Sequence, residues 1–483
     1  MALGETDYGL IGVVGGLTAF VSFLNGIMAG GIGRFYAISV GAERQDPMIG
    51  LEKCREWFTT AVIIHTVLPI MLMLIGYPLG EWAVRHFLAI PIDRIDACVW
   101  VWRYTCLSCI VAMMCVPYQA MYGAKQEIAE LTIYSFITTT ANFIFLYYMI
   151  THARDWLTRY ALWACLLQVI PTLVIAFRSL AKYPECRFRR QYINCWRRIK
   201  EMCAYSCWLI VGTLADVFGN QGVNVFINKL FGPRINAAAT IGNTLSSQCS
   251  SLSGSLIGAF GPAIMNAYGA GNMNDVRVYS NRVCKLATLM LLIFAIPLAL
   301  EIDEVLTLWL KSPPQHAAGL CILALAFTVV DKMAWGYSIA VHAVGRIGLY
   351  QIIVGGIFLL SLPGAWLFYK AGCGVYSAAI SLVVFRIAGV IVRTVFAQHL
   401  VGISFGGWIK KIVSPLLFIS LCSALVGALP RCFVNPSLMR VVITTMLVEC
   451  ILIPLSWGML LGREERVYLA NHLRAWGRRL VNA

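Results

Sequence analysis

The chain has 483 residues, of which 59% are hydrophobic and 13% are charged, and its mean hydropathy is +0.75. Because soluble domains carry about 25% charged residues, this composition excludes an ordinary soluble enzyme. The net charge of +15 would also suit a nucleic-acid-binding protein, but the basic residues lie between apolar blocks long enough to cross a bilayer core of about 30 Å. We therefore interpret the charge as loop charge of a membrane protein.

Apolar windows predict thirteen membrane-spanning helices. In chain order they cover residues 9–30, 57–79, 98–119, 130–151, 157–178, 202–228, 235–264, 284–302, 316–342, 347–369, 374–394, 411–429 and 438–461. One set of alternate loops holds 25 of the 38 Lys and Arg residues, with Arg393, Lys410 and Lys411 among them. Because cytoplasmic loops are enriched in Lys and Arg, we expect a cytoplasmic C-terminus and an outside Met1.

An internal repeat explains the odd number of spans. A shift of 228 residues, without a gap, superimposes four glycines of the first half on four of the second: Gly26, Gly30, Gly33 and Gly41 on Gly254, Gly258, Gly261 and Gly269. The window at 202–228 has no counterpart before residue 9, so we expect that a first span is missing from an original fourteen. The glycine pattern fits either close helix packing or helices that slide around a transport site.

The repeat predicts two six-helix lobes that run in the same sense across the membrane, followed by two accessory helices. We expect an N-terminal lobe at 1–180, a basic cytoplasmic linker at 181–201, a C-terminal lobe at 202–400, accessory helices at 401–461 and a basic tail at 462–483. The basic tracts at 187–200 and 463–479 alternate with Trp, Tyr and Leu, which is typical of amphipathic helices on an anionic leaflet. Nucleic-acid binding is the weaker interpretation.

Short sequence strings carry a family resemblance over essentially the whole chain. They are LGETDYG at 3–9, VSFLNG at 21–26, RF at 34–35, NQG at 220–222, FGP at 231–233, NAA at 236–238, PAI at 262–264 and AVGRI at 343–347. Their order and spacing resemble the multidrug/oligosaccharidyl-lipid/polysaccharide (MOP) exporter superfamily, particularly its polysaccharide-flippase branch. The chain departs from that pattern in lacking a basic residue at Ala239–Thr240 and in lacking the first span.

The resemblance implies an all-α, MATE-like transporter with two lobes around a cavity that opens alternately to the two sides. The implied cargo is an undecaprenyl-diphosphate-linked oligosaccharide. The other implied partners are membrane lipids and the polymerase and glycosyltransferases of polysaccharide or lipopolysaccharide biosynthesis.

Charged side chains inside the predicted spans are the candidate site residues, because each costs about 2.5–3.5 kcal/mol at the centre of a span unless it has a partner or a wet cavity. Asp216 and Asn220 share a helix face, and with Gln221 and Asn224 they form a polar stripe. This stripe would line the cavity, where it binds sugar hydroxyls or a coupling cation, or make an interhelical contact. Coupling-ion candidates are Asp216, Asp331 and Glu449.

Adjacent Asp331 and Lys332 point about 100° apart on a helix, so we expect at least one to face the cavity or to reach Arg386 or Asp216. A purely structural ion pair is the alternative. Arg386 is the principal candidate for holding the diphosphate, because a guanidinium binds phosphate bidentately and keeps its charge at low dielectric.

Three further residues have two interpretations each. Arg34 would meet the diphosphate at the inner mouth or act as a positive-inside anchor, and Arg103 would line the outer half of the cavity or extend outward. Glu449 lies outside the expected lobes, so it would contact another helix or lipid as readily as serve transport. We expect His65 to be a hydrogen-bonded packing residue.

No nucleophile with a base, metal cluster or phosphate loop is recognisable, so we expect no enzyme, metal or cofactor beyond H⁺ or Na⁺ coupling. The Cys106 and Cys109 pair lies inside a span without companion ligands. The sequence favours a monomeric flippase of the cytoplasmic (inner) membrane. The alternatives are a cation-coupled multidrug exporter, which Asp216 and Asp331 favour and Lys332 and Arg386 oppose, and a scaffold without a transport cycle.

Overall fold

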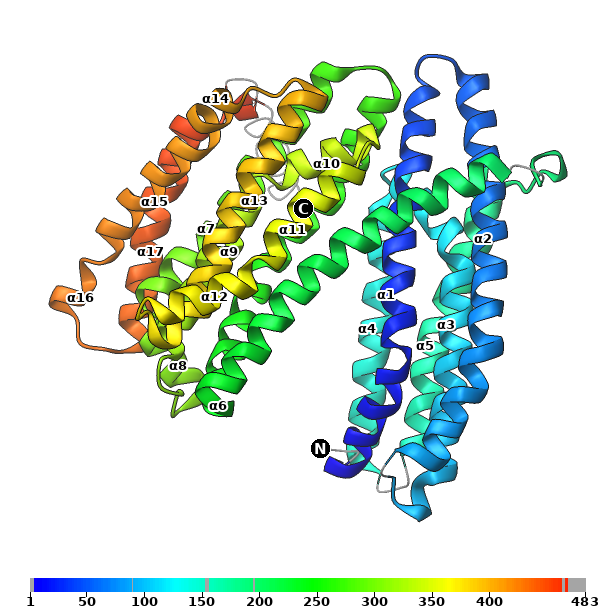
Figure 1. Ribbon diagram of the computed structural model, residues 1–483, viewed down its shortest axis with the longest axis horizontal. Coiled ribbons are helices and arrows are strands. Elements are labelled where there is room, and N and C mark those ends of the chain that lie inside the picture. The colour runs from blue at the N-terminus through cyan, green and yellow to red at the C-terminus, as the bar shows by residue number, and fades with distance from the viewer. Residues whose placement is uncertain (1–3, 89, 153–155, 194–195, 463–464, 468–483) are drawn as a thin grey trace, which may run out of the picture. The chain divides into compact units, whose positions relative to one another are not determined.

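The computed structural model describes residues 4–88, 90–152, 156–193, 196–462 and 465–467, which are helical nearly throughout (Figure 1). The chain divides into two compact units. The first comprises Met1–Ile210 with Met265–Asn272, and the second comprises Val211–Ile264 with Met273–Ala483. The predicted all-α membrane fold is confirmed.

The first unit is built around α3, which packs against α1, α2 and α5. Its long helices are α1 (Gly4–Ala42), α2 (Pro47–Trp82), α3 (Ile95–Ala124), α4 (Ile128–Thr151) and α5 (Leu157–Lys182). The start of α2 is set by Asp46, whose carboxylate accepts the backbone N–H groups of Met48 and Ile49. Pro47 at the first helical position needs no hydrogen-bond partner there.

The second unit contains most of α6 and all later helices. The helices are α6 (Trp196–Gly269), α7 (Met273–Leu300), α8 (Ile302–Leu310), α9 (Ala317–Lys332), α10 (Trp335–Val344), α11 (Gly348–Leu359), α12 (Ser361–Lys370), α13 (Ser377–Val401), α14 (Phe405–Trp408), α15 (Ser414–Gly427), α16 (Pro430–Phe433) and α17 (Leu438–Leu455). Short 3₁₀ or π segments occupy Ala83–Phe87, Ile92–Arg94, Pro184–Cys186, Arg190–Tyr192, Gly374–Tyr376, Ile409–Val413 and Ser456–Leu460.

Ten helices in the described ranges are long and apolar enough to cross a membrane, and the pair α9 and α10, bent by 42°, would add an eleventh. Helix α6 is counted once, although Gly232 breaks it with φ +81° and ψ 176°. Glycine adopts this positive φ without a side-chain clash, and Pro233 has no backbone N–H to donate. The two arms of α6 thus correspond to the windows at 202–228 and 235–264, and α1 covers the window at 9–30.

The prediction of an amphipathic helix at 187–200 is wrong for the first part of that range. Residues 187–193 form a 3₁₀ turn and extended backbone, and α6 begins only at Trp196. The tract is held on α2 by hydrogen bonds, in which the Arg189 backbone N–H donates to Thr59 Oγ1 at 3.2 Å and Arg198 donates to both carboxylate oxygens of Glu56 at 3.0 Å. The second predicted tract, 463–479, lies outside the described residues except at 465–467.

Candidate functional site

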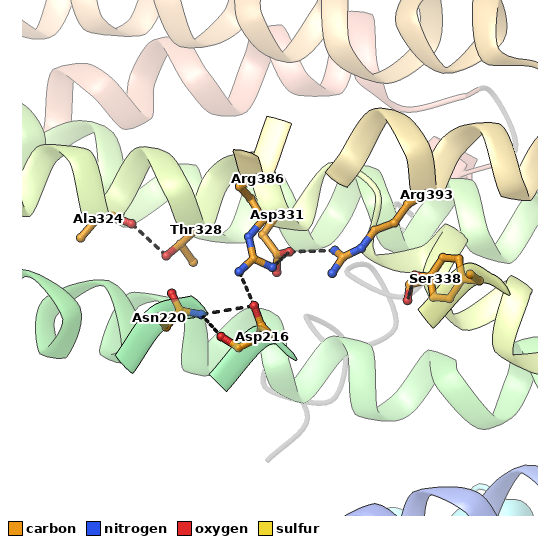
Figure 2. Close-up of polar contacts among 9 residues, drawn as sticks. Asp216, Asn220, Ala324, Thr328, Asp331, Ser338, Arg386 and Arg393 are labelled. Carbon is orange, nitrogen blue, oxygen red and sulfur yellow. Dashed lines mark hydrogen bonds and ion pairs between the residues drawn. The ribbon is translucent and has the colours of Figure 1, made fainter. Parts of the chain in front are cut away.

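Four of the charged residues predicted inside spans meet with Arg393 in one cluster, which we call the charge cluster: Asp216, Asp331, Lys332, Arg386 and Arg393. Figure 2 shows Arg386 between the two carboxylates. Arg386 Nη2 lies 2.6 Å from Asp216 Oδ1 and its Nη1 lies 3.2 Å from Asp331 Oδ1. Arg393 Nη1 lies 2.8 Å from the same Asp331 oxygen. Three helices, α6, α9 and α13, therefore supply one ion-pair network.

The cluster forms at the break between α9 and α10, because Asp331 and Lys332 are the last two residues of α9. The partial negative charge of a helix C-terminus favours Lys332 and disfavours Asp331, and the two arginines of α13 offset the second effect. The break also frees backbone carbonyls, and Trp408 Nε1 donates to the Met333 carbonyl at 3.0 Å. Irregular backbone at membrane depth is tolerated where such partners exist.

Burial differs sharply among the members of the cluster. Asp331, Lys332, Arg386 and Arg393 are each at least nine-tenths buried, whereas 41% of the Asp216 side chain is exposed. Three cations face two carboxylates, so the cluster carries one excess positive charge. Asp216 is the member that a ligand can reach directly.

Aromatic rings complete the cluster. The Arg386 guanidinium lies 4.2 Å from the ring centre of Phe327 and 4.0 Å from that of Phe358. Lys332 Nζ lies 4.7 Å from the Trp335 ring, and the described residues place no carboxylate oxygen within ion-pair distance of it. A cation–π contact stabilises a desolvated cation by about 2 kcal/mol or more. Burial of an ammonium group costs several kcal/mol, so Lys332 is only partly compensated.

The sequence prediction for Arg393 is wrong. The sequence analysis counted it as a cytoplasmic loop residue. In the structure it lies inside α13, which continues to Val401, and it is buried against Asp331. Arg386 and Arg393 are seven residues apart, which places them on one helix face two turns apart. This spacing was the signal that could have identified the second arginine.

The polar stripe continues from the charge cluster along α6. Asn220 Nδ2 donates to the Asp216 carbonyl at 2.8 Å and to its carboxylate at 3.2 Å. One turn further on, Asn224 Nδ2 donates to Gln221 Oε1 at 3.2 Å. Gln221 and Asn224 then border a groove of about 530 Å³, which we call the amide groove.

Both arms of α6 line the amide groove. Its lining residues are Gln221, Asn224, Asn236, Thr240, Asn243, Thr244, Ser247 and Gln248. All eight are neutral amides or hydroxyls. The sequence prediction included Gln221 and Asn224 and missed the residues of the second arm. These follow the helical spacing i, i+4, i+7, i+8, i+11 and i+12 from Asn236.

Two predicted site residues belong to the first unit. Arg34 is buried, with its guanidinium 4.7 Å from the Tyr205 ring and 4.9 Å from the Phe35 ring. Arg103 forms an ion pair with Glu81 at 3.3 Å and lies over the Trp100 ring.

Glu449 lies on α17 in the second unit. Its carboxylate has no ion pair or hydrogen bond within the described ranges, and neither the charge cluster nor the amide groove includes it. His65, in the first unit, is buried and its Nδ1 lies 2.8 Å from the Met113 carbonyl, as expected for a packing residue.

Comparisons with known proteins establish the fold but no further property of the chain. No protein-family profile and no curated protein matches the chain. A multidrug resistance MATE family transporter of the MOP superfamily, in an outward-facing conformation, is 16% identical with a TM-score of 0.66 over 83% of this chain and 89% of its own. A MATE transporter in a bent conformation is 14% identical with a TM-score of 0.68 over 83% and 88%.

A MOP superfamily transporter from Pyrococcus furiosus is also similar. It is 15% identical with a TM-score of 0.62 over 82% of this chain and 91% of its own. The reverse polarity of its binding pocket suggests a different function for that transporter. The chain therefore has a MATE-like transporter fold.

Proposed function

We propose that the protein is a transporter that moves an undecaprenyl-diphosphate-linked oligosaccharide across the cytoplasmic membrane by alternating access. The MATE-like fold and its apolar helices support a multi-pass membrane transporter. The single observation that carries the anionic cargo is the excess of cations over carboxylates in the charge cluster.

A net positive charge at low dielectric favours an anion and repels a cationic drug. Asp216 is the half-exposed carboxylate bound to Arg386. A diphosphate that approaches would compete with it for the guanidinium, which donates two parallel N–H hydrogen bonds to phosphate oxygens. The two arginines of the cluster balance its two carboxylates, so the excess positive charge is that of Lys332. This lysine has an aromatic contact and no carboxylate partner in the described ranges.

The experiment is a complementation assay in a strain that lacks its own flippase. Lys332→Met removes the excess charge without breaking an ion pair, and we expect surface polysaccharide to fall at least tenfold while the protein remains in the membrane. Lys332→Arg is the matched control and should restore it. If the single variants Lys332→Met and Arg386→Lys both produce wild-type amounts of surface polysaccharide, the proposal is overturned.

The second candidate, cation-coupled multidrug efflux, is favoured by the exposed carboxylate of Asp216. It predicts drug resistance on expression that is lost in Asp216→Asn. H⁺ or Na⁺ would bind at Asp216 or Asp331, with Glu449 as a third site. The flippase proposal includes an inner-membrane location, a cytoplasmic C-terminus and a monomer that works beside polysaccharide polymerase and glycosyltransferases.

A further inference from the structure

The amide groove is set apart by what it lacks. Residues 235–274, which cover the second arm of α6 beyond Arg234, contain no Asp, Glu, Lys, Arg or His. The same arm is rich in Asn, Gln, Ser and Thr, and Asn243, Thr244, Ser247 and Gln248 are exposed. A span that presents so many polar groups must border water or a polar ligand, because unsatisfied amides in hydrocarbon cost several kcal/mol each.

The hydroxyls and the amides of the groove differ in their hydrogen bonding. Thr240 and Thr244 donate to helix carbonyls one turn earlier, at 2.9 and 3.0 Å, so their hydroxyls are partly satisfied. The side chains of Asn243 and Gln248 make no hydrogen bond to any described residue, and the buried Asn236 Oδ1 also has no partner among them. These amides are left to bind a ligand or water, with both donors and acceptors.

The polar stripe of α6 links the groove to the charge cluster. Asn220 contacts Asp216, and the next turn carries Asn224, which lines the groove. A second, smaller hollow is lined by Asn220, Asn224 and Asn243 among mostly apolar residues. A ligand with an anionic group at Arg386 would therefore extend its neighbouring part into the amide groove.

We propose that the amide groove binds uncharged sugar units next to the diphosphate of the cargo. This inference rests on the proposed function and names its substrate class. Sugar hydroxyls match amide donors and acceptors, and about 530 Å³ lies within the range of about 300–1,000 Å³ for small-molecule sites. An acidic sugar would lose hydration in the groove without gaining a cation, because no lining residue is charged. The cargo is thus neutral at these positions.

The test measures affinity of the purified full chain in detergent by thermal shift. The three probes are undecaprenyl diphosphate, the same lipid linked to a neutral tetrasaccharide, and the same lipid with a uronic acid at the second sugar. We expect the neutral glycolipid to bind at least tenfold more tightly than the bare lipid diphosphate. The uronic acid should remove most of that gain.

The variants separate the groove from the cluster. Asn243→Leu with Gln248→Leu should lose the gain due to the sugar and keep the affinity for the bare lipid diphosphate. Asn228→Leu is the matched control, since Asn228 is exposed on the same helix and does not line the groove. If the leucine pair fails to fold, Asn243→Ala with Gln248→Ala replaces it, because the smaller side chains avoid a steric clash.

The outcomes are distinguishable. If the bare lipid diphosphate binds and the neutral sugars add nothing, the groove inference fails and the flippase proposal stands. The same conclusion follows if the folded double variant keeps the gain or if the uronic acid binds equally well. Absence of binding by the bare lipid diphosphate to the wild-type protein would instead overturn the flippase proposal.

Discussion

Gly41 and Gly269 are 228 positions apart, and each packs against the backbone of the helix that carries the other. A Cβ atom on Gly41 would lie 2.0 Å from the carbonyl oxygen of Asn266, and one on Gly269 would lie 2.0 Å from that of Ile38. Ile38 and Asn266 are also 228 positions apart, so the contact is reciprocal, as at a two-fold axis. All four residues belong to the first compact unit. The glycines of the sequence repeat thus include a pair that needs to lack a side chain.

The first prediction follows from this crossing. Gly269→Ala should destabilise the protein by about 1–3 kcal/mol, because the new methyl group forces two backbones apart, and Gly41→Ala should act alike. The measurement is the melting temperature in detergent by fluorescence size-exclusion. Gly258→Ala is the control, since a Cβ atom there meets nothing within 4 Å. Equal melting temperatures for Gly269→Ala and Gly258→Ala would contradict the prediction.

Hydropathy was sufficient to predict the helices, because a span must be apolar over its whole length. It missed the break inside the window at 316–342, where α9 ends and α10 begins. Apolar content is the same on both sides of such a break. What permits it is the bond from Trp408 to the Met333 carbonyl, a contact between residues 75 positions apart in sequence that no local pattern contains.

The site was predicted only in part. The sequence indicated that at least one of Asp331 and Lys332 would face the cavity or reach Arg386 or Asp216, because a charge inside a span needs a partner. The positive-inside rule, however, placed Arg393 in a loop. That rule counts basic residues near the ends of spans, and it does not say where a helix such as α13 ends. For the second arm of α6, the glycine pattern left two interpretations open, close helix packing and a helix that slides around a transport site, and neither identified its polar residues. Its polar residues became a groove only through the bend at Gly232.

The second prediction concerns Glu301, which joins the α7–α8 corner to α17. Its fully buried carboxylate lies 2.8 Å from Arg440 Nη2 and accepts Thr444 Oγ1 at 2.9 Å. Glu301→Gln leaves a largely buried arginine without its anion, which costs about 3–5 kcal/mol in comparable sites. We expect a lower melting temperature, and Asp303→Asn, an exposed neighbour, should leave it unchanged. If the melting temperature of Glu301→Gln equals that of wild type within error, the predicted stabilising role of the Glu301–Arg440 ion pair is contradicted.

The third prediction uses charge balance in the cluster. Asp331→Asn leaves Arg393 without its anion, and Arg393→Met leaves Asp331 with one arginine in place of two. Each single variant should reduce the folded yield and the melting temperature. The double variant keeps the net charge of the cluster, so it should lose less than the sum of the two, with a coupling of about 0.5–3 kcal/mol in a double-mutant cycle. Additive losses would show that the two residues act independently.

The last prediction is a pH dependence at the turn after α1, outside the membrane spans. Lys125 Nζ lies 2.9 Å from Glu43 and 2.5 Å from Glu185, so one cation serves two carboxylates. Burial raises the pKa of Glu43 from its ordinary value of 4.5, and Glu185 adds to the rise while Lys125 opposes it. The folded state therefore holds this proton more tightly than the unfolded state, and the contribution of Glu43 to the free energy of unfolding falls as pH rises above 4.5.

Glu43→Gln should remove this fall, so the melting temperature of the variant rises relative to wild type as the pH increases from about 4 to 8. Glu127 provides the contrast, because a hydrogen bond from Lys182 lowers the pKa of its carboxyl. Its stabilising contribution is present above the ordinary pKa and is lost as the pH falls through the folded-state value. Glu127→Gln should therefore be less stable than wild type at neutral pH, with a difference that narrows in acid. Parallel pH profiles for the two variants would contradict the assignment, because their carboxyl pKa values are shifted in opposite directions.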